Sequence, residues 1–356
     1  MNRKKEDTAM KVAIIGHFGG NKSFVDGQTV KTKVLYDELR SATDWDIRTL
    51  DTYYKNKSPV RLLLKLIVLL FSTRHIIILL SSNGRKYLIP LMYLYAKFLR
   101  GNVYHDVIGG NLSAFVKENP KYGKYLNAFR VNWVETALLK KELEEVGVEN
   151  AEILVNFRRK EMVSADELEK EYAAPYRFCT FSRVSEAKGI GEAVAAIRNV
   201  NGAAGTRLCA LDIYGSVDDE YKAAFESLLS DAPDEIRYCG TVPTECAVNT
   251  LKEYYGTLFP TRWEGEGSAG TVTESQFAGV PVIATDWRCN SEMIESGVDG
   301  VVYPGKEART LEEGIQWLIA NKARITQIKR NSLKKAERYL PEYSVPQIIA
   351  CIQSHR

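Results

Sequence analysis

Short apolar runs alternate with longer amphipathic segments along the first part of the chain. The runs at 11–16 (KVAIIG) and 75–80 (HIIILL) are apolar over nearly their whole length, as in strands that are buried on both faces of a parallel sheet. Between such runs, apolar residues recur with the period of a helix, and this order indicates βαβ units. We expect strands at 11–16, 46–50, 75–80 and 103–108 and helices at 31–40, 60–71 and 87–99.

The alternation pauses near the middle of the chain and then restarts. After weaker strands, the segment at 157–175 is polar and lacks a strand pattern, which suggests a boundary. Because 356 residues exceed the roughly 250–300 at which a single core stops growing, two domains are expected. Further strands are expected at 131–134, 153–156, 178–181, 208–214, 235–238, 256–260 and 281–285.

This pattern predicts an α/β protein of two doubly wound, Rossmann-like domains that face a central cleft. We expect the N-terminal domain at 1–157, the C-terminal domain at 158–340, and a last helix within 341–356 that packs back on the first domain. Ligands of open parallel sheets bind beyond the carboxyl ends of the strands. Candidate functional residues are therefore sought where strands end.

The net charge of +3 hides an asymmetry between the two halves of the chain. Residues 1–150 hold 24 Lys and Arg against 15 Asp and Glu, a net charge of +9, whereas the remainder has a net charge of −6. A basic half indicates an anionic partner, and nucleic acid, an anionic bilayer surface and a diphosphate-bearing lipid are all compatible with it.

Cysteine usage and the N-terminus predict a cytoplasmic protein without a metal site. The six cysteines lie in the second half without a C-x-x-C pair, as expected for buried side chains in a reducing compartment. The basic N-terminus precedes an apolar run of only a strand's length, so no signal peptide is expected. Asp44 and Asp46 form a D-x-D that precedes a strand and has no third ligand nearby, so we expect no bound metal.

The segment at 60–71 (VRLLLKLIVLLF) resembles a membrane helix, but Arg61 and Lys65 interrupt it, and it falls short of the roughly 20 apolar residues of a spanning helix. Two interpretations remain open. The segment is either a core helix or a basic, apolar helix that lies in the interface of an anionic bilayer.

Polar and glycine-rich positions of the first domain follow its strands. The loop at 16–27 (GHFGGNKSFVDG) lacks the G-x-G-x-x-G pattern, but its glycines would let backbone N–H groups approach a phosphate; an ordinary turn is the alternative. Gln28 and Thr29 open the next helix, where we expect them to face the cleft on the acceptor side. His105 ends the strand at 103–108, where it could bind a sugar hydroxyl or serve a structural role.

Two cations follow the first strand of the second domain. Arg183 and Lys188 lie five residues apart in FSRVSEAKGI. Arg can bind a diphosphate through its planar fork and Lys as a point charge, and both would stabilise the charge of a departing nucleotide diphosphate. Solvated loop cations are the alternative.

Two carboxylates, Glu266 and Glu274, lie eight residues apart in the glycine-rich stretch FPTRWEGEGSAGTVTES. The predicted helix starts near Thr271, so Gly270, Thr271 and Val272 would present N–H groups to a phosphate. The alternative for Glu274 is a capping box with Thr271, which would not explain the glycines around Glu266.

Taken in order, these motifs resemble the group 1 (family 4) glycosyltransferases of GT-B fold, in particular bacterial polysaccharide-assembly members. The resemblance covers nearly the whole chain and is strongest over 178–305. It rests on TFSRVSEAKGI, IYG at 213–215, YCGTVP at 238–243, the two glutamates of E-x7-E, AGVPVIATDW at 278–287 and EMIESGVDGVVYPG.

The resemblance implies roles by position. Arg183 and Lys188 would bind the donor diphosphate and stabilise it as the leaving group, Glu274 would hold the ribose hydroxyls, and Glu266 would contact the donor sugar. It also implies contacts with the base from Gly240, Thr241 and Val242, with the donor phosphate and the acceptor from Gly19 and Gly20, and with the transferred sugar from His105.

Two positions depart from the family pattern. Ser182 stands where the family usually has a glycine before the arginine. Glu264 is a rival first glutamate, and Glu266 is preferred because it preserves the spacing of eight residues.

The expected function is that of a retaining glycosyltransferase that needs neither a metal nor another cofactor. It would transfer a sugar from a nucleotide-diphosphate donor to a lipid-linked or glycan acceptor in capsule or exopolysaccharide synthesis, at the inner face of the plasma membrane and without a nucleic-acid partner. The alternatives are a nucleotide-sugar epimerase of the same fold, against which the scarcity of histidine argues, and a non-catalytic nucleotide-sugar-binding protein, which would not need Glu266.

Overall fold

The protein is described by a computed structural model that covers residues 9–20, 27–304 and 308–355. The chain forms two compact units. Unit 1 comprises Met1–Arg159 and Tyr339–Arg356, and unit 2 comprises Lys160–Arg338.

Unit 1 is built on a parallel sheet of six strands in the order β2-β1-β3-β4-β5-β6. The direction of the strand order reverses between β1 and β3, which makes the carboxyl ends of these two strands the switch point of the sheet. The strands are β1 (Lys11–Gly16), β2 (Asp46–Asp51), β3 (His75–Leu80), β4 (Asn102–Val107), β5 (Val131–Val134) and β6 (Ala151–Ile153).

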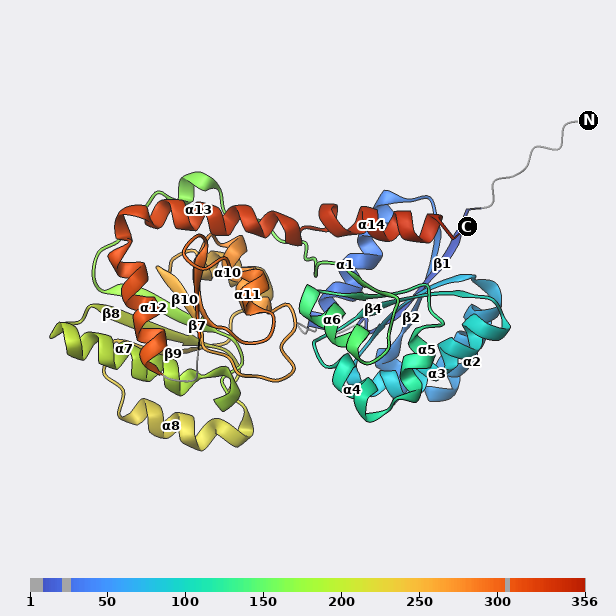
Figure 1. Ribbon diagram of the computed structural model, residues 1–356, viewed down its shortest axis with the longest axis horizontal. Coiled ribbons are helices and arrows are strands. Elements are labelled where there is room, and N and C mark those ends of the chain that lie inside the picture. Colours follow the sequence, from blue (N-terminus) through green and yellow to red (C-terminus); the bar gives the residue numbers. More distant parts are fainter. Residues whose placement is uncertain (1–8, 21–26, 305–307, 356) are drawn as a thin grey trace, which may run out of the picture. The chain divides into compact units, whose positions relative to one another are not determined.

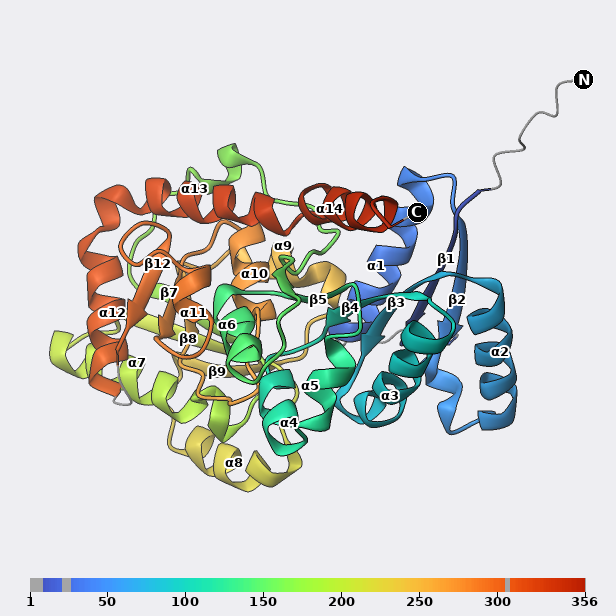
Figure 2. The same ribbon diagram turned by 45° about the vertical axis from the view of Figure 1, so that its right-hand side comes forward.

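Helices cover both faces of this sheet, which explains why β3 and β4 are buried at every position. Figure 2 shows α1 and α14 on the opposite side of the sheet from α2 and α3. The last helix packs on α1, and its Val345, Ile348 and Ile352 join the core of unit 1 (Figure 1). The helices are α1 (Gly27–Ala42), α2 (Pro59–Ser72), α3 (Ser82–Phe98), α4 (Leu112–Glu118), α5 (Lys121–Leu126), α6 (Ala137–Glu145) and α14 (Pro341–Gln353).

Unit 2 has a second parallel sheet of six strands, in the order β12-β11-β10-β7-β8-β9. Here the reversal lies between β7 and β10, so the loops after these two strands start side by side. The strands are β7 (Tyr176–Phe181), β8 (Cys209–Tyr214), β9 (Ile236–Gly240), β10 (Gly256–Phe259), β11 (Val282–Thr285) and β12 (Gly300–Tyr303). The helices are α7 (Ile190–Ala204), α8 (Lys222–Ser230), α9 (Ala247–Leu251), α10 (Gly270–Phe277), α11 (Asn290–Met293), α12 (Ala308–Ala320) and α13 (Ile325–Ala336).

The prediction of two doubly wound α/β domains is confirmed. Each strand expected from an apolar run has a counterpart, but β6 spans Ala151–Ile153 and shares only one residue with the expected 153–156. The strand β12 was missed, because it has only four residues and the middle two are partly exposed at the edge of the sheet. Helices α1 and α3 begin earlier than expected, since their first turns are polar and lack the apolar period.

Lys329 on α13 is fully buried, and its Nζ donates to the carbonyl of Tyr254 at 2.7 Å. Burial, together with the neighbouring charge of Lys170, lowers the pKa of this amine from 10.5 to about 7. Between these two pKa values the unfolded chain binds more protons than the folded one, so this group makes the free energy of unfolding rise with pH.

We expect Lys329→Met to remove this dependence. Urea unfolding is measured at pH 7, 8 and 9. The free energy of unfolding of the wild type minus that of the variant should increase with pH, by at most about 1.4 kcal/mol per pH unit. Lys334→Met, at an exposed position of the same helix, is the control and should follow the wild type. Parallel profiles of the wild type and Lys329→Met would contradict the prediction.

Candidate functional site

The predicted cations and carboxylates of unit 2 lie at the switch point of its sheet. Arg183 follows β7, and Lys188 closes a short 3₁₀ turn at Glu186–Lys188. Glu266 lies in the loop between β10 and α10. Since β7 and β10 are neighbours in the sheet, the fold brings these two loops together.

Lys188 and Glu266 form the central contact of this site. The Nζ of Lys188 lies 2.5 Å from Oε2 of Glu266, and the Thr261 hydroxyl donates to the same oxygen at 2.9 Å. The two charged side chains are only 13% and 7% exposed. The ammonium also lies 4.9 Å from the ring centroid of Trp263, within the range of a cation–π contact. The two charges therefore hold each other in fixed positions.

This contact distinguishes Glu266 from its rival. Glu266 is buried and bound to Lys188, whereas Glu264 is exposed. The geometry therefore favours Glu266 as the first glutamate of the motif.

Gly189 sets how closely the two loops approach. It has a φ of 69°, in the left-handed region, and a Cβ at this position would lie 2.3 Å from the carbonyl oxygen of Pro260. Only glycine satisfies both constraints. The residue after Lys188 is thus pressed against the end of β10, which places the amine next to the Glu266 loop.

Arg183 and Lys188 line one pocket of about 570 Å³, a size typical of ligand sites. The Arg183 side chain is 61% exposed, and its Nε lies 3.6 Å from a carboxylate oxygen of Asp218. Sequence reasoning missed the acidic and aromatic part of this lining. It comprises Glu186, Asp218, Glu220, Tyr221 and Trp263.

The helix α10 begins at Gly270, and Ala269 is its N-cap residue. This excludes the capping box, because Thr271 is the second residue of the helix and its hydroxyl donates to the Phe181 carbonyl at 2.7 Å. Thr271 instead ties α10 to the end of β7. Gly270, Thr271 and Val272 occupy the first turn, whose N–H groups lack a carbonyl four residues earlier within the helix.

Glu274 is buried, with 5% exposure, and its Oε2 lies 3.5 Å from Nζ of Lys160. Lys160 also donates to the Thr244 carbonyl. It was missed because it lies in the polar segment that the sequence marks only as a boundary.

The predicted base-contacting residues lie at the carboxyl end of β9. Gly240 has a φ of 76°, and its carbonyl accepts the Gly215 N–H at 2.8 Å. Thr241 is exposed, while Gly240 and Val242 are partly exposed. They lie at the same edge of the sheet as Arg183 but outside the lining of its pocket.

In unit 1, the N–H groups of the glycine-rich loop at 16–27 were expected to approach a phosphate, but those of Phe18 and Gly20 bind a carboxylate of the protein. The carboxylate of Asp51 accepts the N–H of Phe18 at 2.9 Å and the N–H of Gly20 at 2.8 Å. The Gly20 N–H therefore points to Asp51 rather than to a phosphate, and Gly19 takes a φ of 83° in the turn between them. The rest of the predicted loop, residues 21–26, lies outside the described residues.

Gln28 and Thr29 lie in different environments, the first at a pocket and the second in the interior. The Gln28 amide donates to the Leu79 carbonyl at 2.9 Å and lines a second pocket. Thr29 is fully buried, with its hydroxyl 2.6 Å from Nδ1 of His17, so the expectation that it faces a ligand is wrong.

His105 lies in the interior of unit 1, with 0% exposure. Its Nδ1 is 3.0 Å from Oδ1 of Asn132, and its Nε2 has no partner among the described residues. Burial, together with the charge of Arg85, lowers its pKa to about 3, so the ring is neutral. The structural role is supported, and the expected contact with a sugar is not possible in this conformation.

Residues 166–338, which lie within unit 2, match the family described as "Glycosyl transferases group 1". This match, over just under half of the 356 residues, makes unit 2 similar to the group 1 glycosyltransferases. A curated relative is the amylovoran biosynthesis glycosyltransferase AmsK of Erwinia amylovora, 28% identical over 141 residues. This match covers 38% of the chain and 34% of the relative, so the chain aligns with about a third of that protein.

Solved structures share the fold across the whole chain. HepE of Anabaena, in a complex with UDP-glucose, has a TM-score of 0.70 at 12% identity and covers 97% of this chain and 100% of that one. Sucrose-phosphate synthase of Thermosynechococcus elongatus has a TM-score of 0.72 at 14% identity, covering 97% and 98%. The chain therefore has the GT-B fold.

The site of unit 2 makes a prediction about two glycines at the ends of α7. Gly189→Ala should lower the free energy of unfolding by more than about 1 kcal/mol, because the new methyl group meets Pro260 and the φ is positive. Gly202→Ala has open space around it inside the helix, and should raise stability by roughly 0.5–1 kcal/mol. Chemical denaturation of both variants measures the difference, and equal effects of the same sign would refute the packing argument.

Proposed function

We propose that this protein is a retaining, metal-independent glycosyltransferase that moves a sugar from a nucleotide-diphosphate donor to a lipid-linked or glycan acceptor in cell-surface polysaccharide synthesis. The observation that carries the proposal is the Lys188–Glu266 contact beside Arg183, at the switch point of a nucleotide-binding type of sheet. AmsK, whose name assigns it to amylovoran biosynthesis, supports the polysaccharide context.

The cations act on the donor diphosphate. Arg183 presents its planar fork from an exposed loop, and Lys188 supplies a charge whose position is fixed by Glu266. As the bond between the anomeric carbon and the diphosphate oxygen breaks, its electron pair passes to that oxygen, and both cations stabilise the growing charge. The acceptor hydroxyl forms the new bond on the same face and gives its proton to the departing diphosphate.

The carboxylates position the rest of the donor. Oε2 of Glu266 binds Lys188 and Thr261, and we assign Oε1 to a hydroxyl of the donor sugar. Glu274, beside Lys160, is assigned to the ribose hydroxyls. No group of His, Cys, Asp and Glu within the described residues is arranged to hold a metal ion, and the proposed reaction uses charges of the protein alone.

The assay begins with the nucleotide. UDP-, GDP-, ADP- and TDP-sugars are compared by thermal shift, with UDP-glucose first because the HepE structures contain UDP-glucose or UDP. Turnover is then measured with polyprenyl-diphosphate-linked acceptors. Stabilisation by none of the nucleotides would reject the proposal.

Glu266→Gln tests the assigned carboxylate without changing the size of the side chain. We expect kcat to fall by about a hundredfold, since the interaction acts on the reacting sugar. Glu264→Gln, two residues away on the exposed side of the loop, is the matched control and should retain activity within about twofold. If the two variants lost activity equally, the assignment of Glu266 would be wrong.

We also propose that unit 1 contacts an anionic membrane through α2. The outer face of this helix exposes Val60, Leu63, Leu64, Ile67, Val68 and Phe71. Exposed apolar side chains flanked by Arg61 and Lys65 suit a helix that lies in the interface of a bilayer. No helix of the described chain is long and apolar enough to cross one.

The membrane contact predicts that the protein sediments with vesicles containing phosphatidylglycerol and that Phe71→Ser weakens this binding several-fold. Tyr343→Ser removes another exposed aromatic residue of unit 1, on α14, and should leave vesicle binding unchanged. Equal losses in the two variants, or no binding by the wild type, would exclude α2 as the contact.

A further inference from the structure

A second pocket, of about 470 Å³, lies at the carboxyl ends of β1 and β3, where the strand order of unit 1 reverses. Its volume is within the roughly 300–1,000 Å³ of small-molecule sites. The pocket is apolar at its centre, because β2, α2, β3 and α3 all contribute leucines to it. These are Leu50, Leu62, Leu66, Leu79, Leu80 and Leu88.

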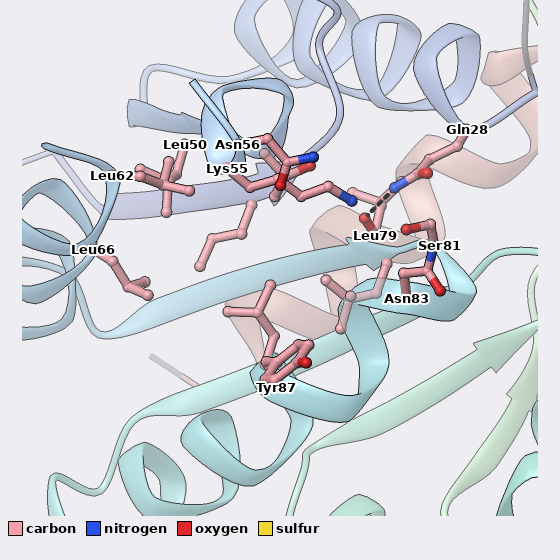
Figure 3. A pocket seen from close by; sticks show the side chains of 15 residues that line it. Gln28, Leu50, Lys55, Asn56, Leu62, Leu66, Leu79, Ser81, Asn83 and Tyr87 are labelled. Carbon is pink, nitrogen blue, oxygen red and sulfur yellow. Dashed lines mark hydrogen bonds between the residues drawn. The ribbon is translucent and has the colours of Figure 1, made fainter. Parts of the chain in front are cut away.

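The pocket has an apolar end and a polar end. Figure 3 shows Leu62 and Leu66 of α2 at one end and Gln28, Ser81 and Asn83 at the other. Lys55 extends its amine toward the polar end in this view. A ligand that matches this lining has a hydrocarbon part and a polar, anionic part.

One helix forms both the wall of this pocket and the exposed apolar face of unit 1. Leu62 and Leu66 of α2 point inward, and Leu63, Leu64 and Ile67 are 42–60% exposed on its outer side. Eleven of the sixteen exposed large hydrophobic side chains in the described part of the chain lie between Tyr54 and Leu99, on α2, α3 and their flanks. The pocket thus lies directly behind the surface that is assigned to the bilayer.

Cations predominate around the pocket, although Asp51 stands between the lining residues Leu50 and Thr52 and binds the N–H groups of Phe18 and Gly20. Residues 52–105 contain nine Lys and Arg and no Asp or Glu. Most of these cations are exposed, including Lys55 at the pocket itself. An anionic group with a hydrocarbon tail is the ligand class that such a site attracts.

We infer that this pocket binds the first segment of the hydrocarbon chain of a diphosphate-linked lipid, which serves as the acceptor. The chain packs against the leucines near α2, and the diphosphate lies toward Lys55 and the polar end, at the strand termini where ligands of such sheets bind. The inference rests on the proposed function, since it assigns the lipid-linked class of acceptor to unit 1.

Binding of farnesyl diphosphate tests the inference, with inorganic diphosphate as the probe that has the same charge but no chain. Titration calorimetry of the full chain, without bilayers, should give at least a tenfold lower Kd for farnesyl diphosphate. Equal affinities for the two probes would overturn the inference.

Two neighbouring residues of α2 provide a matched pair of variants. Leu62→Trp fills the pocket and should raise the Kd for farnesyl diphosphate about tenfold, with that for inorganic diphosphate unchanged. Leu63→Trp places the same ring on the outer side of the helix and should bind farnesyl diphosphate as the wild type does in this membrane-free assay. Similar effects of the two substitutions would overturn the inference.

A nucleotide thermal shift reports whether each variant is folded. If Leu62→Trp fails to fold, substitution of the exposed Lys55 provides a second test. Lys55→Gln should weaken the binding of both farnesyl diphosphate and inorganic diphosphate several-fold. Lys57→Gln, which lies outside the lining, should not change the binding of either probe. A protein that transfers sugar to a soluble glycan but does not bind farnesyl diphosphate would retain the proposed function and lose this inference. A protein that binds farnesyl diphosphate but no nucleotide would retain the lipid-binding pocket and lose the proposed function, and with it the assignment of the lipid as the acceptor.

Discussion

The buried contact between Lys188 and Glu266 joins the loops that follow the two central strands of unit 2, and the geometry of the candidate site depends on it. A buried ion pair contributes little net stability, because desolvation of the two charges opposes their attraction. Here the ion pair instead fixes the positions of the two loops and of their charged side chains. The pairing of β7 with β10 brings the loops together, Gly189 allows them to touch, and the Thr261 hydroxyl fixes the carboxylate.

Both units place a pocket at the point where the strand order reverses, but they line it with opposite chemistry. In unit 2 the lining carries Arg183, Lys188 and several carboxylates, and in unit 1 six of the fifteen lining residues are leucines and none is a carboxylate. The topology determines where each pocket lies, and the side chains after each strand determine what it can hold. This difference supports the proposal that unit 2 binds the donor and unit 1 the acceptor.

The sequence predicted the strands well and several side-chain environments poorly, for one physical reason. A parallel sheet covered by helices is buried on both faces, so apolar runs reveal its strands but not which polar residue points outward. His105 lies on a buried strand and Thr29 on the inner side of α1. Both were expected to face a cleft, because His105 lies just before a loop and Thr29 just after one. Partners distant in sequence, such as Asp51 for the Gly20 N–H and Lys160 for Glu274, have no local signal.

The helix α2 shows why its sequence admitted two interpretations. An apolar pattern on all sides fits a core helix and an interfacial helix equally well, and only its neighbours decide between them. In the structure, Leu66 and Leu69 are buried, while the side opposite them stays exposed with Arg61 and Lys65 at its flank. The inner face of α2 is therefore that of a core helix, and its outer face is that expected of an interfacial helix. A large exposed apolar patch on a folded protein calls for a partner, and a bilayer on the outer face with a lipid chain on the inner face would satisfy both sides of the same helix.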